Sequence, residues 1–388
     1  MGGAGTGYPT DLLDRRGPGP ITEIQRACVD EATLACVKDV SRALMGGEPA
    51  DPLAAAVHAA VVAQIDGMDA AERFLGARSM EPERLHRFLA FIALVIGEGE
   101  RAEHHLALGW PGPVDDHLGD ADRATIIANL ARLDMAAERS QRAIMRRLIR
   151  AFRVEGQNDR MSIPEAQRVQ MMEVFALSGK ERGYIRIVGM LDGAGAWTDG
   201  GHKRRARLTN WVATRDLTKT PQEIEDSHAK IASAFDRDAV RSGIISRLIT
   251  EGQGDKAARL VPLIEGPLVG ALSRLTLAEA GMTGLDRAAR LALVDGIDLE
   301  VPPLARRGDF AVRVHLARAA LGAEGAEADT EAALAAFLEG DGVAGFADLA
   351  LRLARAGRAG EALRVALYAP NARIAVFNAV SGMVEAAP

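Results

Sequence analysis

Apolar positions along the chain recur with the spacing of helices, and the alternation typical of strands is missing. No window of five or more residues alternates β-branched or aromatic residues with polar ones between turn signals. We therefore expect an all-α protein. The helical segments that the pattern predicts are 22–45, 51–65, 69–77, 81–97, 98–108, 121–154, 163–178, 180–191 and 221–235.

Two of these helices begin with a complete local signal. Ser162-Ile-Pro-Glu165 and Thr220-Pro-Gln-Glu223 both fit a capping box. In this motif the hydroxyl accepts a hydrogen bond from the amide three residues on, and the glutamate accepts one from the amide of the cap residue. Proline also fits in the first turn, where its missing N–H costs nothing.

Glycine and proline divide the chain into regions. Residues 1–20 contain six Gly and three Pro, so we expect a flexible arm. Residues 21–195 then form a helical N-terminal domain. A Gly-rich boundary and a linker helix follow at 196–235, and helical hairpins occupy 236–388.

The hairpins of the last region share a signature. Residues 247–260 and 352–365 each place an apolar helix before a glycine turn and a small-residue helix after it. Over about 150 residues this pattern resembles degenerate tetratricopeptide-like repeats, although it lacks the aromatic positions of their first helix. The resemblance implies an α-solenoid-like array, because one hairpin cannot bury its apolar face alone. It also implies turns at Gly252, Gly281 and Gly357 and close helix packing at Ala257, Ala288, Ala332 and Ala362.

Composition and charge narrow the class of protein. A net charge of −6 argues against a general nucleic-acid binder. The basic residues are 41 Arg and only six Lys, a bias typical of a GC-rich bacterial coding sequence. The longest apolar run, Phe88 to Ile96, is too short to cross a bilayer. Residues 1–20 lack the apolar core of a signal peptide, so we expect a cytoplasmic protein, or a periplasmic one if a signal peptide has been removed.

The chain has two cysteines, Cys28 and Cys36. Both fall within the helix predicted over 22–45, where eight residues separate them by about 12 Å along the axis. At that distance they cannot form a disulfide with each other. We therefore expect both to be small buried apolar residues.

Signals for catalysis, cofactors and metals are weak. The glycines at 2–7 have neither the preceding strand nor the following Lys of a phosphate loop. The region of His104, His105 and His117 is rich in acids, but adjacent histidines on a helix point about 100° apart and cannot face one ion. We expect no metal and no cofactor. No nucleophile motif is recognisable, so an enzyme is unsupported by the sequence.

Basic residues form two clusters, which are the candidate partner-binding sites. One is a stripe at helical spacing, and its guanidinium groups share one face of a helix. The other follows the Gly-rich boundary. The members are Arg139, Arg142, Arg146, Arg150 and Arg153 in the stripe, and Lys203, Arg204, Arg205 and Arg207 in the second cluster. A solvated helix face is the alternative interpretation of the stripe.

These observations favour a non-enzymatic scaffold or adaptor whose helical-repeat surface binds another protein. The alternative is a regulatory module that binds an anionic partner, either nucleic acid or a membrane surface, through the arginine stripe. A helical enzyme of unknown reaction is the third hypothesis.

Overall fold

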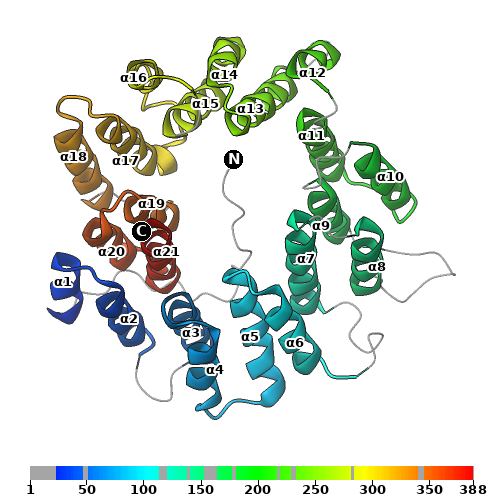
Figure 1. Ribbon diagram of the computed structural model, residues 1–388, viewed down its shortest axis with the longest axis vertical. Coiled ribbons are helices and arrows are strands. Elements are labelled where there is room, and N and C mark those ends of the chain that lie inside the picture. The colour runs from blue at the N-terminus through cyan, green and yellow to red at the C-terminus, as the bar shows by residue number, and fades with distance from the viewer. Residues whose placement is uncertain are drawn as a thin grey trace. The chain divides into compact units, whose positions relative to one another are not determined.

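Every regular element that the structure describes is a helix (Figure 1). The predicted all-α class is therefore confirmed. No described helix combines the length and apolar character needed to cross a membrane. The computed structural model describes residues 23–46, 51–112, 120–137, 140–152, 163, 165–176, 181–215, 219–228, 233–280, 284–339 and 345–387. The arm predicted at 1–20 lies outside these ranges.

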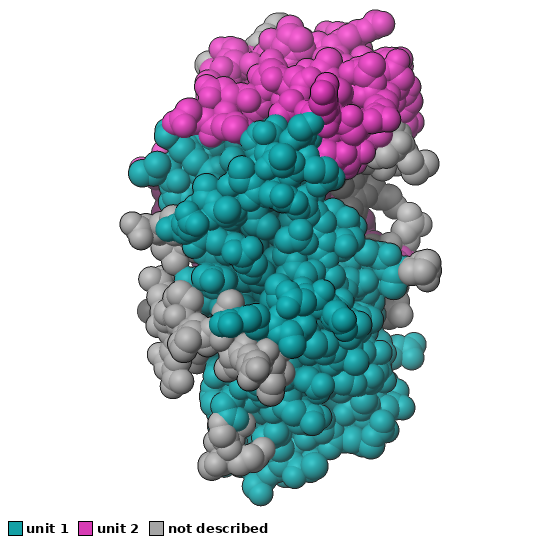
Figure 2. Space-filling model, turned by 90° about the vertical axis from the view of Figure 1, so that its left-hand side faces the viewer, with its two compact units in different colours: residues 1–111, 302–316, 325–388 teal, residues 112–301, 317–324 magenta. Residues whose placement is uncertain are grey.

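The chain forms two compact units, coloured separately in Figure 2. Unit 1 comprises residues 1–111, 302–316 and 325–388, and unit 2 comprises 112–301 and 317–324. Unit 1 contains α1 (Glu23–Asp30), α2 (Leu34–Ala43), α3 (Pro52–Asp66), α4 (Met68–Gly76), α5 (Pro82–Val95), α6 (Gly99–Gly109), α18 (Ala326–Glu339), α19 (Phe346–Arg355), α20 (Ala359–Tyr368) and α21 (Ala372–Ala386). Unit 2 contains α7 (Ala121–Ala136), α8 (Gln141–Phe152), α9 (Glu165–Ala176), α10 (Glu181–Asp192), α11 (Asp199–Arg215), α12 (Pro221–His228), α13 (Ala234–Thr250), α14 (Gly254–Leu260), the 3₁₀ turn η3 (Val261–Leu263), α15 (Pro267–Glu279) and α16 (Arg287–Asp295). Residues of α17 (Leu304–Ala320) belong to both units.

Helix neighbours in unit 2 follow a regular order (Figure 1). Helices α7, α9, α11, α13 and α15 contact one another in that order, each packing against the next. Helices α8, α10, α12, α14 and α16 each pack against the helix that precedes them. Each hairpin therefore buries its first helix against the first helix of the next hairpin.

Unit 1 is built around α3. Every residue from Ala54 to Ala63 in this helix is buried, because α2, α4, α5 and α21 surround it. The last helices of the chain thus pack on its first helices. The side chain of Gln64 donates a hydrogen bond to Ser381 over 2.6 Å, and Arg373 donates one to the carbonyl of Leu44 over 2.9 Å.

The division into units differs from the one that the sequence predicts. The Gly-rich segment expected as a boundary lies inside unit 2, where α11 packs against α9 on one side and α13 on the other. Residues 236–388, expected as one array, are divided between the units. The physical reason is that α20 packs against α1, and α21 packs against α2 and α3, at the start of the chain.

The predicted glycine turns at Gly252 and Gly357 are present. Both residues have positive φ, 70° and 78°, a conformation that glycine adopts without steric cost. In each turn the following amide donates to a carbonyl five residues back, over 2.8 Å at Gln253 and 2.9 Å at Arg358. The α5–α6 junction at Gly97, where the sequence predicts the end of one helix and the start of the next, has the same pattern. Gly281 lies outside the described residues.

Cys28 is buried as expected, but the prediction that the two cysteines cannot form a disulfide is wrong. The helix predicted over 22–45 is broken at residues 31–33, where the hydroxyl of Thr33 accepts the amide of Cys36 and caps α2. The break brings the two Cα atoms within 5.7 Å, and Cys28 and Cys36 form a disulfide.

A second predicted helix is also two helices. The segment 121–154 divides into α7 and α8, because α7 ends with Ala137 as its C-cap. Of the two capping boxes, the one at Thr220 is confirmed: its amide and hydroxyl both donate to Glu223, whose own amide donates back to the hydroxyl. Ser162 lies outside the described residues.

The four alanines expected at close helix contacts provide a matched test of packing. Ala257 and Ala362 are fully buried, as predicted, whereas Ala288 and Ala332 are exposed, contrary to the prediction. Replacing Ala257 or Ala362 with phenylalanine should overpack the helix contact and lower the free energy of unfolding by about 1–3 kcal/mol. The same change at Ala288 or Ala332 should have little effect. Equal thermal midpoints for all four variants would contradict this packing.

Candidate functional site: the basic helices of unit 2

The positive charge of the chain is concentrated in one stretch of unit 2. Residues 139–219 contain 17 Lys and Arg but only 8 Asp and Glu, whereas the whole chain contains 47 and 53. Helix α8 has four arginines and no acid. Although the net charge of the molecule is negative, this stretch of the chain is strongly basic.

The arginine stripe is outward-facing where the structure describes it. Ile144 and Leu148 are buried, whereas Arg142 and Arg146 lie on the exposed side of α8. Neither arginine has an ion-pair partner among the described residues. By contrast, Arg147 turns toward α7 and contacts Asp134 over 3.1 Å. Arg139, Arg153 and the side chain of Arg150 lie outside the described part of the chain.

The second cluster is largely neutralised within the fold. Arg204 contacts Glu173 of α9 over 2.9 Å, and Arg205 contacts Asp192 of α10 over 2.7 Å. The guanidinium of Arg207 lies over the ring of Phe235 at 4.6 Å. Among the four residues, only Lys203 is exposed and has neither an ion pair nor a ring contact with another described residue. These cations mainly attach α11 to its neighbours.

The two predicted clusters lie on different helices, α8 and α11, and α8 packs against α7 and α9 rather than against α11. The structure instead brings α10 close to the stripe. Gly183, near the start of α10, faces the side chain of Gln141 at the start of α8, so that a Cβ there would lie 3.2 Å from its Oε1 atom. The starts of these two helices are therefore adjacent.

Helix α10 adds two exposed residues that the sequence analysis missed. Arg186 is exposed and has no ion-pair partner in the described region, and Ile185 beside it is 53% exposed. Two arginines in a helix that also carries Glu181 and Asp192 give no cluster signal. We call Arg142, Arg146, Ile185 and Arg186 the outer basic face.

The Gly-rich segment before α11 is held against α9. Arg168 is buried and donates hydrogen bonds to the carbonyls of Gly195 over 2.7 Å and Ala196 over 2.5 Å. Glu165, one turn earlier, accepts the amide and the hydroxyl of Thr198, and these bonds lower the pKa of its carboxyl. Burial lowers the pKa of Arg168. The segment that the sequence predicts as a boundary is thus an ordered connection.

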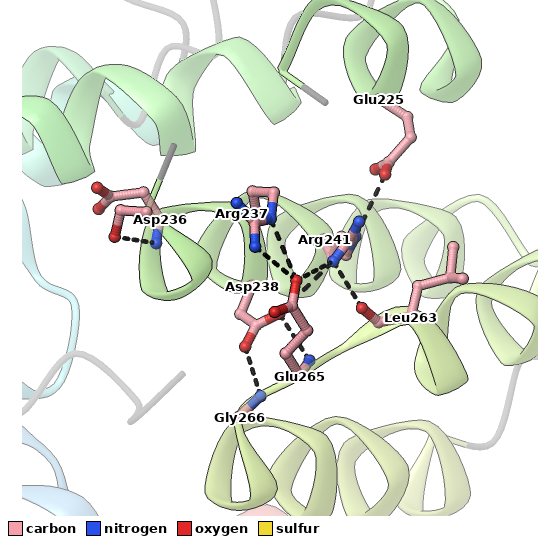
Figure 3. Close-up of polar contacts among 9 residues, drawn as sticks. Glu225, Asp236, Arg237, Asp238, Arg241, Leu263, Glu265 and Gly266 are labelled. Atoms are coloured by element: carbon pink, nitrogen blue, oxygen red, sulfur yellow. Dashed lines mark hydrogen bonds and ion pairs between the residues drawn. The ribbon is translucent and has the colours of Figure 1, made fainter. Parts of the chain in front are cut away.

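A second buried network fixes α15 to α13 (Figure 3). Asp238 is 2% exposed and accepts the amides of Glu265 over 3.0 Å and Gly266 over 2.7 Å, directly before α15 begins. Arg241 contacts Glu225 over 3.2 Å and donates to the carbonyl of Leu263 over 2.6 Å. Every polar group here has a partner within the fold, so the network has a structural role.

The histidine region expected to hold no metal forms a hydrogen-bonded cluster in unit 1. His105 is buried, and its Nε2 atom lies 3.2 Å from Glu72 and its Nδ1 atom 3.0 Å from His86. Burial is the main cause that lowers the pKa of both histidines. No group of three or more metal-ligating side chains occurs among the described residues. His104 is exposed, and His117 lies outside those residues.

No protein-family model matches the chain, and neither a curated protein nor a solved structure matches it significantly.

Proposed function

We propose that the protein is a non-enzymatic scaffold that binds another protein through the surface of its helical hairpins. The observation that carries this proposal is the ordered packing of the hairpins from α7 to α16. Successive hairpins that pack side by side present several helix faces to one partner, as helical-repeat proteins do. The recurrent glycine turns support the same interpretation, because they give separate hairpins one local geometry.

The outer basic face supports a binding role. Arg142 and Arg146 are one helical turn apart, and like charges at this spacing destabilise a helix by a few tenths of a kcal/mol. Neighbouring arginines such as Arg147 and Arg205 do have acidic partners. Arg142 and Arg146 have no acidic partner among the described residues, and their mutual repulsion costs the helix some stability. Such a surface is suited to a partner protein that supplies acidic side chains.

The proposal predicts a stoichiometric protein complex. Tagged full-length chain, purified from its source cells at moderate salt, should co-elute with one partner protein in gel filtration, and light scattering should give a defined ratio. Unfolding the hairpins by heat before mixing should abolish the complex. A native chain that elutes alone at every salt concentration would contradict the scaffold function.

A further inference from the structure

We propose that the outer basic face is a docking surface for an acidic, amphipathic helix of a partner protein. This inference rests on the scaffold function and names the chemistry of the partner. Beyond the scaffold function, the proposal places the contact with the partner on α8 and α10 and specifies the side chains that make it.

The charges and their spacing fit such a helix. Arg142, Arg146 and Arg186 are exposed and unpaired in the described part of the chain. Arg142 and Arg146 are separated by about 6 Å along α8, which matches two glutamates placed four residues apart on another helix. A guanidinium forms paired hydrogen bonds with a carboxylate and stays charged at any relevant pH. The face can therefore hold an acidic stripe in one register.

The uncharged residues of the face distinguish between classes of partner. Ile185 is 53% exposed next to Arg186 in the sequence and offers an apolar contact at the edge of the acidic stripe of a docked helix. The exposed described residues of α8 and α10 include no aromatic side chain, and single-stranded nucleic acid uses such rings to stack its bases. A membrane surface needs a broad apolar face, which one isoleucine does not provide. The face thus favours an acidic protein helix.

Direct binding to a probe peptide tests this assignment. The probe is a fluorescein-labelled peptide of about 20 residues with glutamates four residues apart and leucines along one edge of the glutamate stripe. Its affinity for the full chain is measured by fluorescence polarisation. Binding should weaken markedly as salt rises from about 50 to about 300 mM, because exposed charges are screened over that range. The same peptide with lysine in place of glutamate should not bind.

Variants locate the binding site. The triple variant R142Q/R146Q/R186Q should bind the acidic peptide at least about tenfold more weakly, while its thermal midpoint stays the same or rises slightly. The matched control R26Q/R259Q/R364Q removes three exposed arginines elsewhere and should keep wild-type affinity. The charge-reversed variant R142E/R146E/R186E should bind the lysine peptide instead.

Three results would overturn the assignment. Equal losses in the triple variant and its control would mean that only net charge matters. In a second case, labelled duplex DNA or vesicles of phosphatidylserine bind more tightly than the peptide at the same salt and displace it. That result would mean that the ligand of the outer basic face is this anion and not a protein helix. If the triple variant still binds the co-purified partner protein, the outer basic face is not the contact surface, although the protein still acts as a scaffold. Failure of the scaffold proposal would be recognised separately, because the wild-type chain would then co-purify with no partner protein.

Discussion

Replacing Asp238 with alanine is expected to lower the free energy of unfolding by about 3–5 kcal/mol. The side chain is 3% exposed and lies 3.7 Å from the guanidinium of Arg241. It accepts the two amides that precede α15, at Glu265 and Gly266 (Figure 3). Alanine would leave both amides unsatisfied and remove one carboxylate from beside a largely buried arginine. Urea denaturation of the purified variant measures the loss.

Two further variants control for this prediction. Asp236→Ala lies in the first turn of the same helix, where loss of a favourable dipole interaction should cost less than about 1 kcal/mol. Asp238→Asn keeps one acceptor oxygen, so its loss should fall between those of the two alanine variants. If Asp238→Ala were no less stable than Asp236→Ala, the network would not fix α15 to α13.

Acid should destabilise the protein through His58 by up to about 3 kcal/mol. Burial in α3, followed by the nearby charges of Arg42 and Arg78, lowers the pKa of His58 from 6.5 to about 4. The ring is 1% exposed, and its Nδ1 atom lies 3.0 Å from the hydroxyl of Ser41. Because its folded pKa is depressed, the unfolded chain takes up the proton first. The stability that neutral His58 contributes therefore begins to fall as the pH drops below about 6.5. Its loss is nearly complete by about pH 4.

The histidine prediction needs a readout that separates His58 from other groups. The lowered pKa values of His86 and His105 act in the same direction, so the wild-type pH dependence alone is not specific. His58→Gln should show a flatter fall in stability between pH 6.5 and pH 4 than the wild type. An NMR titration that gives His58 an ordinary pKa near 6.5 would contradict the prediction.

The sequence predicts the helices well because their signals are local. Apolar spacing and capping residues are read within a few positions, and the box at Thr220 forms as expected. The breaks within 22–45 and 121–154 were missed, since Thr33 lacks the glutamate that completes a capping box and Ala137 gives no stop signal. The division into units depends on contacts such as Gln64 with Ser381, which no local pattern encodes.

The candidate site was predictable in part. Spacing alone placed Arg142 and Arg146 on one face, and both are exposed. Whether a cation is neutralised depends on acids of neighbouring helices, such as Glu173 beside Arg204, so the sequence could not separate paired from unpaired members. Arg186 joins the face only because the start of α10 meets the start of α8, as the contact of Gly183 with Gln141 shows.

Amide hydrogen exchange of the full chain, with and without its co-purified partner protein, tests the central claim most directly. If the scaffold holds that partner on the outer basic face, exchange should slow in α8 and α10 when the complex forms, and the triple variant R142Q/R146Q/R186Q should lose this protection. Proteolytic fragments from α1 and α20, which are far from the outer basic face along the chain, serve as internal references for the exchange measurement. Unchanged exchange in α8 and α10, with protection elsewhere or nowhere, would contradict the account.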